Sequence, residues 1–405
     1  MPEHCRIEPT GLPKLILLAV CTLGLLACAG PRHPPSPYAP RQDASAAQQR
    51  ALDLAARGYP GAPRPASAQP STVELSVASQ QWVVNGEPLT TVLAAPVAGP
   101  NRLPLLVYLP GLGESAQAGA HWRYAWARAG YAVLSFQALA ADQTAWSSDL
   151  ARSADFKALA LQHQQPQLLQ ARLRMLLGAI KEAKLRAAGA DAGGDGLWRR
   201  IDADRIAVLG YDLGAATALA WAAGLEPLSG DRARAVVMLS PSALTRSEAT
   251  QAIATLPANL PLLAINSRGA ADLNGLLNSP AERHQFFEQL PPDTHKYLLL
   301  LNSPSHAALA GASGMAESPN EPAGGGMARR APSQASHGPG QHNTIMSAAP
   351  PPTLLDKGNQ EAGVAVEHIS IAFLNTYLRA DPPAQSWLQQ SASVWLKGLA
   401  EWRLR

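Results

Sequence analysis

Cysteine is scarce in this sequence and is confined to one end of it. The three cysteines are Cys5, Cys21 and Cys28, so no residue after position 28 can join a disulfide or supply a thiolate to a metal ion. A thiol nucleophile and a cysteine-based zinc site are therefore excluded for most of the chain. We expect neither a metal nor a cofactor.

A large excess of charge of either sign is lacking too. Charged residues make up 16% of the 405 residues, and the formal net charge at pH 7 is only +3. The basic residues are scattered, without a run that follows a phosphate backbone, so we expect no nucleic-acid partner. Hydrophobic residues make up 47% of the chain, which is enough for one large core.

A short apolar run near the N-terminus predicts export. Residues 15–26 read LILLAVCTLGLL and follow the basic residues Arg6 and Lys14. The run is shorter than a membrane span and is typical of the apolar part of a signal peptide.

The end of this run resembles a bacterial lipobox. Residues 25–28 read LLAC, and the resemblance implies that residues 1–27 are removed and that Cys28 is lipidated. Lipidation implies a membrane-anchored protein of the cell envelope that faces an extracytoplasmic compartment. Ala29 follows Cys28 where an aspartate would indicate inner-membrane retention, which by analogy with Gram-negative lipoproteins favours the outer membrane. A plain secretory signal and an uncleaved anchor helix are the alternatives.

Two stretches of biased composition divide the chain. Residues 28–70 are rich in Pro, Ala, Gln and Arg, which is typical of a tether. Residues 311–362 are rich in Gly, Pro, Ser and Asn, and we expect a disordered insertion there. Their few large apolar residues cannot offset the entropy lost on ordering. The folded domain is therefore predicted to span residues 71–405.

The apolar segments of this domain predict its fold class. Residues 82–93 read as a hairpin with Asn85-Gly86 at its turn. Continuous apolar strands then alternate with helices, which indicates an α/β domain with a mostly parallel central sheet and helices on both faces. A hairpin before such a sheet is typical of the α/β-hydrolase fold. The expected strands are 105–109, 131–136, 205–209, 235–239, 262–265 and 297–301, and the expected helices include 122–129, 167–188, 215–223, 364–379 and 385–395.

The segment after the strand 205–209 is the most informative in the chain. It reads Gly210-Tyr211-Asp212-Leu213-Gly214 and leads directly into a helix of small residues. This is the form of the nucleophile elbow, in which the central side chain is exposed on a strained turn at the positive end of a helix. Gly210 and Gly214 are expected because strand and helix pack too closely for a Cβ. The central residue is usually serine, whereas here it is Asp212.

A glycine-rich turn follows the strand 105–109. Residues 109–115 read LPGLGES. In the α/β-hydrolase fold this turn donates one backbone N–H to the oxyanion hole, and the residue after the nucleophile donates the other. We therefore predict that Leu112 and Leu213 form the oxyanion hole, with an ordinary strand-to-loop turn as the alternative.

A base and an acid are expected after the nucleophile in chain order. His306 is the best-placed histidine because it closely follows the strand 297–301, and His284 and His295 are the fallbacks. Asp272 is the candidate acid because it is the nearest carboxylate after the strand 262–265. A solvated loop aspartate is an equally good interpretation of Asp272.

Together these segments resemble the dienelactone hydrolase and platelet-activating-factor acetylhydrolase-like branch of the α/β-hydrolases. The resemblance spans roughly residues 103–389 and includes PGLGE, GYDLGAATALA, SPSHAAL and AFLNTYLRADPPAQSWL. It implies a hydrolase acting on a small molecule. The family has histidine at the position of Pro110 and serine at that of Asp212, so this chain lacks the hydroxyl on which ester hydrolysis depends.

Three functions follow from the sequence. In the first, the Asp212 carboxylate attacks an sp³ carbon and His306 activates the water that cleaves the ester, as in haloalkane dehalogenases and epoxide hydrolases. Those enzymes usually carry tryptophan where this chain has Leu213. In the second, the chain is a catalytically inactive hydrolase homologue that binds a ligand or partner at the cell surface. In the third, another serine, Ser115 or Ser240, hydrolyses esters, although neither lies on an elbow.

Overall fold

The computed structural model describes residues 40–63, 73–100, 102–190, 196–224, 233–241, 256–269, 282–290, 295–303, 306–311, 342–346 and 359–405. The chain divides into two compact units, Met1–Ala46 and Ala47–Arg405, and the second contains the whole sheet. Cys28 and Asp272 lie outside the described residues, as do the first part of the expected tether and most of the 311–362 segment.

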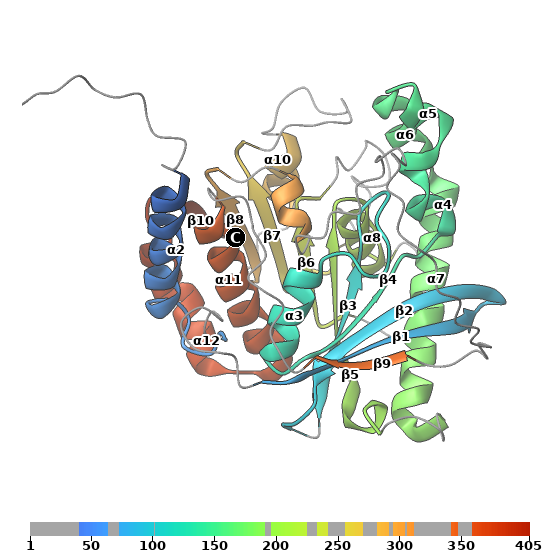
Figure 1. Cartoon of the computed structure of the whole chain (residues 1–405), viewed down its shortest axis with the longest axis horizontal. Helices are drawn as coiled ribbons and strands as arrows, with labels where there is room; N and C mark the ends of the chain where they lie inside the picture. Colours follow the sequence, from blue (N-terminus) through green and yellow to red (C-terminus); the bar gives the residue numbers. More distant parts are fainter. Residues whose placement is uncertain are drawn as a thin grey trace, which may run out of the picture. The chain divides into compact units, whose positions relative to one another are not determined.

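A ten-stranded sheet forms the centre of the second unit (Figure 1). Six strands, in the spatial order β4-β3-β5-β6-β7-β8, run parallel to one another. Antiparallel pairing adds β2, β1 and β9 at one edge and β10 at the other. The prediction of an α/β domain with a mostly parallel sheet is confirmed. The strands are β1 (Leu75–Val84), β2 (Glu87–Pro96), β3 (Leu103–Leu109), β4 (Ala132–Phe136), β5 (Ile201–Tyr211), β6 (Ala235–Leu239), β7 (Leu262–Ser267), β8 (Lys296–Leu301), β9 (His342–Met346) and β10 (Ala400–Leu404).

Helices connect most of the parallel strands. The longer ones are α2 (Pro40–Ala56), α3 (Ala120–Arg128), α6 (Phe156–His163), α7 (Pro166–Leu185), α8 (Leu213–Ala222), α10 (Glu282–Gln289) and α11 (Gln360–Arg379). The short ones are α4 (Ala140–Gln143), η1 (Ala145–Ser147), α5 (Asp149–Arg152), η2 (Arg186–Ala190), η3 (Trp198–Arg200), η4 (Ala307–Ala310), α12 (Pro382–Ser386), η5 (Trp387–Ser391) and α13 (Ala392–Trp395). Among the helices that the structure describes, none is long and apolar enough to cross a membrane.

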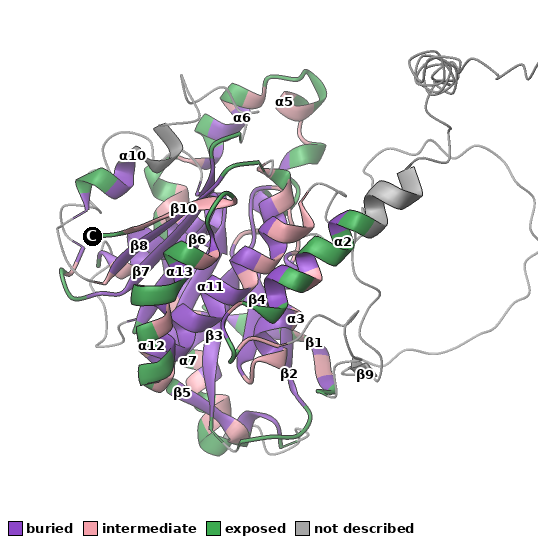
Figure 2. Ribbon diagram, turned by 90° about the vertical axis from the view of Figure 1, so that its left-hand side faces the viewer, coloured by how far each residue is buried: buried purple, intermediate pink, exposed green. Residues whose placement is uncertain are grey.

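The parallel part of the sheet is buried on both faces because its strands are mostly apolar. Side chains alternate across a strand, so Leu105 and Val107 of β3 join one core, with α7 and α8, while Leu106 and Tyr108 join the other, with α3 and α11. Figure 2 shows these strands buried along most of their length, and in β5 only Asp204 and Arg205 are not buried. The two cores hold β3 and β5, and therefore the turns at their ends, in fixed positions.

The first hairpin forms where the sequence predicts it. Asn85 and Gly86 both have positive φ, 53° and 84°, between β1 and β2. Positive φ at both central residues is the requirement of the type I′ turn, which matches the twist of the flanking strands. In the segment expected to be a disordered insertion, the structure describes one strand, β9, which pairs with β1.

The packed unit begins earlier in the chain than the expected boundary at residue 71. Ala51 and Leu54 of α2 are buried, and Trp395 Nε1 donates a hydrogen bond of 2.9 Å to Leu54 O. Tyr59 is also buried, and its hydroxyl donates to Asp381 Oδ2 at 2.9 Å.

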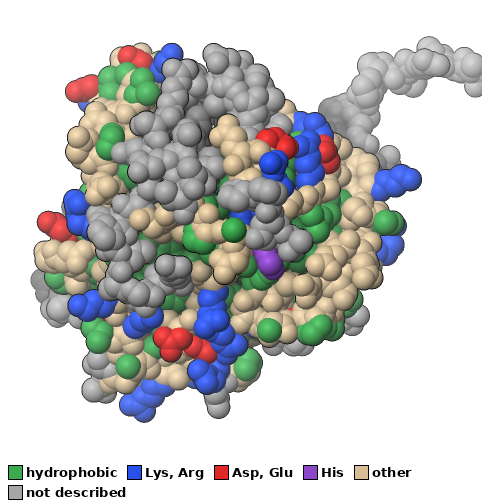
Figure 3. All heavy atoms as spheres, turned by 180° about the vertical axis from the view of Figure 1, so that it is seen from behind, with side chains coloured by type: hydrophobic (Ala, Val, Ile, Leu, Met, Phe, Trp, Pro, Cys, Tyr) green, Lys and Arg blue, Asp and Glu red, His purple; other side chains and the backbone are tan. Residues whose placement is uncertain are grey.

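On the surface drawn in Figure 3, Lys and Arg side chains lie in small groups beside Asp and Glu side chains.

Candidate active site

The predicted elbow is a strained turn between the central strand and a buried helix. Strand β5 ends at Tyr211, α8 begins at Leu213, and Asp212 between them has φ 49° and ψ −115°. Positive φ at a residue other than glycine costs about 1–3 kcal/mol and is held only where the surrounding structure enforces it. A Cβ on Gly214 would lie 2.1 Å from Leu109 O, and one on Gly210 would lie 2.3 Å from the Gly214 carbonyl carbon. Both glycines are therefore required by close packing.

Two consecutive backbone N–H groups of the turn after β3 bind carboxyl groups. Leu112 N donates to Asp212 Oδ2 at 3.4 Å, and Gly111 N donates to Glu114 Oε2 at 2.7 Å. The predicted oxyanion donor Leu112 thus points at the elbow residue. Among the described residues, the N–H of Leu213 makes no hydrogen bond with the Asp212 carboxylate.

His306 lies beside the other oxygen of the elbow carboxylate. Its Nε2 is 3.8 Å from Asp212 Oδ1, an atom that is buried and has no hydrogen bond among the described residues. The imidazole stacks on the Tyr211 ring, with centroids 4.9 Å apart, and Tyr211 Oη donates to His306 O at 3.2 Å. The residue before Asp212 therefore fixes the histidine that faces Asp212.

Ser240 occupies the far side of the His306 ring. It follows β6, has a positive φ of 40°, and its Oγ is 2.7 Å from His306 Nδ1. The side chain is fully buried, so Ser240 is out of reach of a substrate and instead orients the imidazole. Sequence reasoning considered Ser240 only as a nucleophile. Its place at the end of a strand next to β5 was the signal that pointed to the site.

Ser115 and His295 make their contacts elsewhere, and the remaining two candidates fall outside what the structure describes. Ser115 Oγ accepts a hydrogen bond from Gln117 N at 3.2 Å within its own turn. His295 packs against the Tyr377 ring, with centroids 5.7 Å apart. The side chain of His284, like the whole of Asp272, lies outside what the structure describes.

Glu114 is a functional candidate that sequence reasoning missed. Burial raises its pKa to about 7, against the lowering effect of the Gly111 N–H, and the nearby Asp212 raises it further. At neutral pH Glu114 is thus divided between a carboxylic acid and a carboxylate. A carboxyl group that titrates near pH 7 beside a second carboxylate is suited to proton transfer.

Residues 140–163, which we call the cap segment, pack over the elbow. Ala145 and Leu159 from the cap segment form a small apolar cluster with Leu112 and Leu213. Trp146 Nε1 donates to Leu112 O at 3.0 Å. The surroundings of Asp212 on this side are therefore apolar, and Asp212 itself is only 7% exposed.

A buried ion cluster attaches the cap segment to α7. Arg172 donates from Nε and Nη2 to the two oxygens of Asp142 at 2.7 and 2.8 Å, and His163 Nδ1 lies 2.8 Å from Asp142 Oδ1. Burial alone raises the pKa of Asp142, but the Arg172 and His163 hydrogen bonds outweigh it and leave the pKa lowered. The backbone O of Asp142 also accepts a hydrogen bond from Gly113 N at 2.8 Å, so the cluster supports the glycine-rich turn after β3, which we call the oxyanion turn because it is predicted to supply an oxyanion donor.

We expect Glu114→Gln to make stability less dependent on pH. The folded protein keeps the Glu114 proton up to about pH 7, whereas the unfolded chain loses it near 4.5. The stability contributed by Glu114 is therefore full below 4.5 and is lost as pH rises through 7. When the pH is raised from about 5 to about 8, the free energy of unfolding of the wild-type protein should fall by about 1–2 kcal/mol more than that of the variant, allowing for partial exposure.

Urea unfolding of both proteins at the two pH values measures this gain. Glu87→Gln, at an exposed position on β2, is the matched control for the loss of a surface carboxyl. A Glu114→Gln difference that is equal at both pH values would contradict a raised pKa at this position.

Within the part of the chain that the structure describes, no group of three or more His, Cys, Asp or Glu residues is arranged to hold a metal ion. Asp212, His306 and the Leu112 N–H place a carboxylate, an imidazole and a hydrogen-bond donor next to one another. Comparison of the chain with known protein-family models and with curated proteins finds a match to neither.

Proposed function

We propose that this protein is a hydrolase of the α/β-hydrolase fold that uses Asp212 as a carboxylate nucleophile. The observation that carries the proposal is that the two oxygens of Asp212 have different neighbours. The Leu112 N–H holds Oδ2, and Oδ1 faces His306 without a hydrogen bond among the described residues. The hairpin before a parallel sheet, the elbow after β5 and the histidine after β8 support the fold.

In the first step Asp212 Oδ1 attacks an sp³ carbon of the substrate. A C–O bond forms, the bond from that carbon to its leaving group breaks, and the electron pair departs with the leaving group. The product is an alkyl ester of Asp212. The Leu112 N–H keeps Oδ2 in place, so Oδ1 is the oxygen presented to the substrate.

In the second step water attacks Cγ of this ester while His306 Nε2 takes its proton. Negative charge then develops on Oδ2, which is already bound to the Leu112 N–H, the predicted oxyanion donor. As the intermediate collapses, the Cγ–Oδ1 bond breaks and His306 returns its proton to the departing Oδ1, which releases the alcohol and leaves the water oxygen on Asp212. In this mechanism Ser240 Oγ accepts a hydrogen bond from the Nδ1–H of His306, which leaves Nε2 unprotonated for this role.

The apolar cluster beside Asp212 and the raised pKa of Glu114 favour an epoxide as the substrate class. Leu112, Leu213 and Leu159 offer no hydrogen bond from their side chains, and the Trp146 N–H that would suit a halide is already bonded to Leu112 O. A neutral Glu114 donates its proton to the epoxide oxygen as the ring opens. The second proton of the attacking water, left on the Asp212 carboxyl, returns to Glu114 and balances the cycle.

A single turnover in ¹⁸O-water tests the proposal. With enzyme in excess over a small apolar epoxide, we expect ¹⁸O in the Asp212 peptide by mass spectrometry and none in the first diol released. Asp212→Asn is the control and should incorporate no label. Label in the diol and not in Asp212 would show direct attack by water and overturn the carboxylate mechanism.

The second candidate is a catalytically inactive homologue that binds a ligand or partner at the cell surface. It is favoured by the low exposure of Asp212 and by the bond of Leu112 N–H to the Asp212 carboxylate, which fills the predicted oxyanion hole. Turnover of no epoxide or haloalkane, together with unchanged ligand binding in Asp212→Asn, would support this function over hydrolysis.

We also propose that the protein is a lipoprotein of the cell envelope, anchored to the outer membrane through Cys28, without a nucleic-acid partner. The LLAC sequence at residues 25–28 carries this proposal. We expect globomycin treatment, or Cys28→Ala, to replace a processed membrane-bound form with a precursor on immunoblots. A mature protein that begins at another residue and is released without lipid would contradict it.

A further inference from the structure

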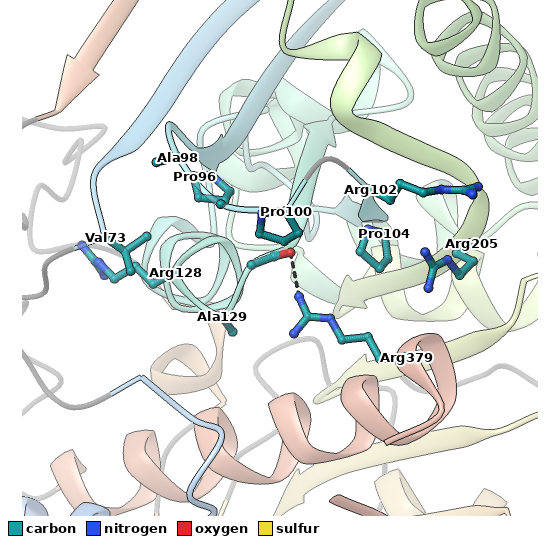
Figure 4. A pocket seen from close by; sticks show the side chains of 12 residues that line it. Val73, Pro96, Ala98, Pro100, Arg102, Pro104, Arg128, Ala129, Arg205 and Arg379 are labelled. Carbon is teal, nitrogen blue, oxygen red and sulfur yellow. Dashed lines mark hydrogen bonds between the residues drawn. The ribbon is translucent and has the colours of Figure 1, made fainter. Parts of the chain in front are cut away.

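A cavity lies at the opposite end of the strands from Asp212. It has a volume of about 440 Å³ and is lined by residues from the starts of β3 and β5, the ends of α3 and α11, and the loop after β2 (Figure 4). Arg205 and Tyr211 are six residues apart on β5, so the cavity and the elbow are separated by roughly 20 Å. The cavity is therefore distinct from the candidate active site.

Four arginines line this cavity, and two of them are held rigidly. Arg379 donates to Gly130 O at 2.7 Å and to Asn375 Oδ1 at 3.1 Å, and it lies over the Tyr131 ring, 4.3 Å from its centroid. Arg205 donates to Leu378 O at 3.4 Å. Because backbone carbonyls fix these side chains, their ordering costs little when a ligand binds.

The other two arginines are less fully bonded. Arg102 is 75% exposed and contacts Asp202 at 3.2 Å, a carboxylate that Arg205 also binds at 2.7 Å. Arg128 has a buried Nε with no hydrogen-bond partner among the described residues. An unpaired buried donor on a guanidinium is costly unless a ligand or water meets it.

Positive charge exceeds negative charge at this cavity. Asp202 is shared by Arg102 and Arg205, and Glu367 is the carboxyl group that acts on Arg128. Burial raises the pKa of Glu367 to about 7, so this partner is itself partly protonated near neutral pH. Among the described residues, the lining of the cavity includes four arginines and neither an aspartate nor a glutamate.

We propose that this cavity is a binding site for a phosphate ester. Guanidinium groups match the geometry of phosphate oxygens and bind them through paired charge-assisted hydrogen bonds. The volume is larger than a phosphate group needs, and Pro96, Pro100 and Ala129 supply apolar walls for the organic part of the ligand. The site is independent of the proposed hydrolase function.

Titration calorimetry of the full chain with glycerol phosphate tests the site. We expect saturable binding that weakens as salt is raised, because the interaction is between charges. Arg102→Gln and Arg128→Gln should each weaken binding about tenfold by removing one charge-assisted contact. Absence of binding to the wild-type protein would overturn the proposal.

Arg50→Gln is the matched control. Arg50 is 59% exposed and pairs with Glu361 at 3.4 Å, so it resembles Arg102 in exposure and partner but lies outside the cavity. Glycerol phosphate affinity should be unchanged in Arg50→Gln. An equal loss in Arg50→Gln and Arg102→Gln would show diffuse surface attraction and overturn the site. If Arg128→Gln fails to fold, the exposed Arg102 carries the test alone.

The phosphate ester can be a soluble metabolite or a lipid headgroup, and vesicles distinguish the two sources. Flotation is compared between vesicles of phosphatidylcholine alone and vesicles that also contain phosphatidylglycerol. If the preference for phosphatidylglycerol is lost in Arg102→Gln, the ligand is a headgroup. If the preference is absent or persists in Arg102→Gln while its glycerol phosphate binding is lost, the ligand is soluble.

Discussion

Replacing Arg172 by methionine should lower the free energy of unfolding by about 3–5 kcal/mol, because it leaves the Asp142 carboxylate buried without its main partner. Asp142 is fully buried, and both of its oxygens accept hydrogen bonds from Arg172. His163 alone can compensate only when it is protonated. The loss should appear as a lower midpoint in urea unfolding with an unchanged slope.

Arg152→Met, within the cap segment, is the matched control. Arg152 pairs with Asp149, but both side chains are exposed, at 65% and 96%, so its removal should change stability by less than about 0.5 kcal/mol. A double variant, Asp142→Asn with Arg172→Met, removes both charges and should recover part of the loss. A single Arg172→Met variant as stable as Arg152→Met would show that the cluster does not hold the cap segment.

The elbow could be read from the sequence because all its requirements are local. A buried strand, two glycines and a helix of small residues follow one another within 205–223, and the structure gives the turn at Asp212 its strained φ. The hairpin at Asn85-Gly86 could be read for the same reason. The parallel strands could be predicted because each is a short continuous apolar run, too short for a buried helix.

Features that depend on distant residues could not be read in this way. Ser240 and His306 are 66 positions apart, and nothing near Ser240 in the sequence indicates that its hydroxyl meets the imidazole. The cluster of Asp142, His163 and Arg172 lies on three elements with no shared spacing. The raised pKa of Glu114 results from burial, which the residue type does not reveal.

The helix boundaries near the C-terminus also depend on distant residues. The sequence predicts residues 385–395 as one helix, whereas the structure has α12, η5 and α13 in succession. Trp387 and Trp395 pack against each other at 5.3 Å between centroids, and Trp387 lies 5.6 Å from Tyr59. Through this contact Tyr59, from a region predicted to be a tether, joins the core.

Asp212→Ser should convert the site into one that reacts with fluorophosphonate probes, whereas the wild-type protein should not react. Serine hydrolases need a hydroxyl whose proton passes to histidine as the oxyanion forms. A carboxylate cannot follow that path usefully, because its attack on an ester gives an anhydride and its charge repels the developing oxyanion. The wild-type protein should therefore also show negligible turnover of short p-nitrophenyl esters.

The variant should fold, because serine is smaller than aspartate and Gly210 and Gly214, which set the turn, are unchanged. Serine frees the Leu112 N–H that Asp212 Oδ2 occupies, so the predicted oxyanion hole becomes available to the probe. His306 Nε2, now 3.8 Å from Asp212 Oδ1, is close to where the serine hydroxyl would lie. A general base in this position contributes about 10²–10⁴-fold to the rate of attack.

Two double variants show which serine is labelled. Asp212→Ser with Ser240→Ala should retain the label, because Ser240 is buried and only orients His306, whereas Asp212→Ser with His306→Ala should lose it. Labelling of the wild-type protein to the level of Asp212→Ser would refute Asp212 as the nucleophile-position residue. A folded Asp212→Ser variant that stays unlabelled would show that the oxyanion turn or the base no longer functions, which favours the inactive homologue over the carboxylate hydrolase.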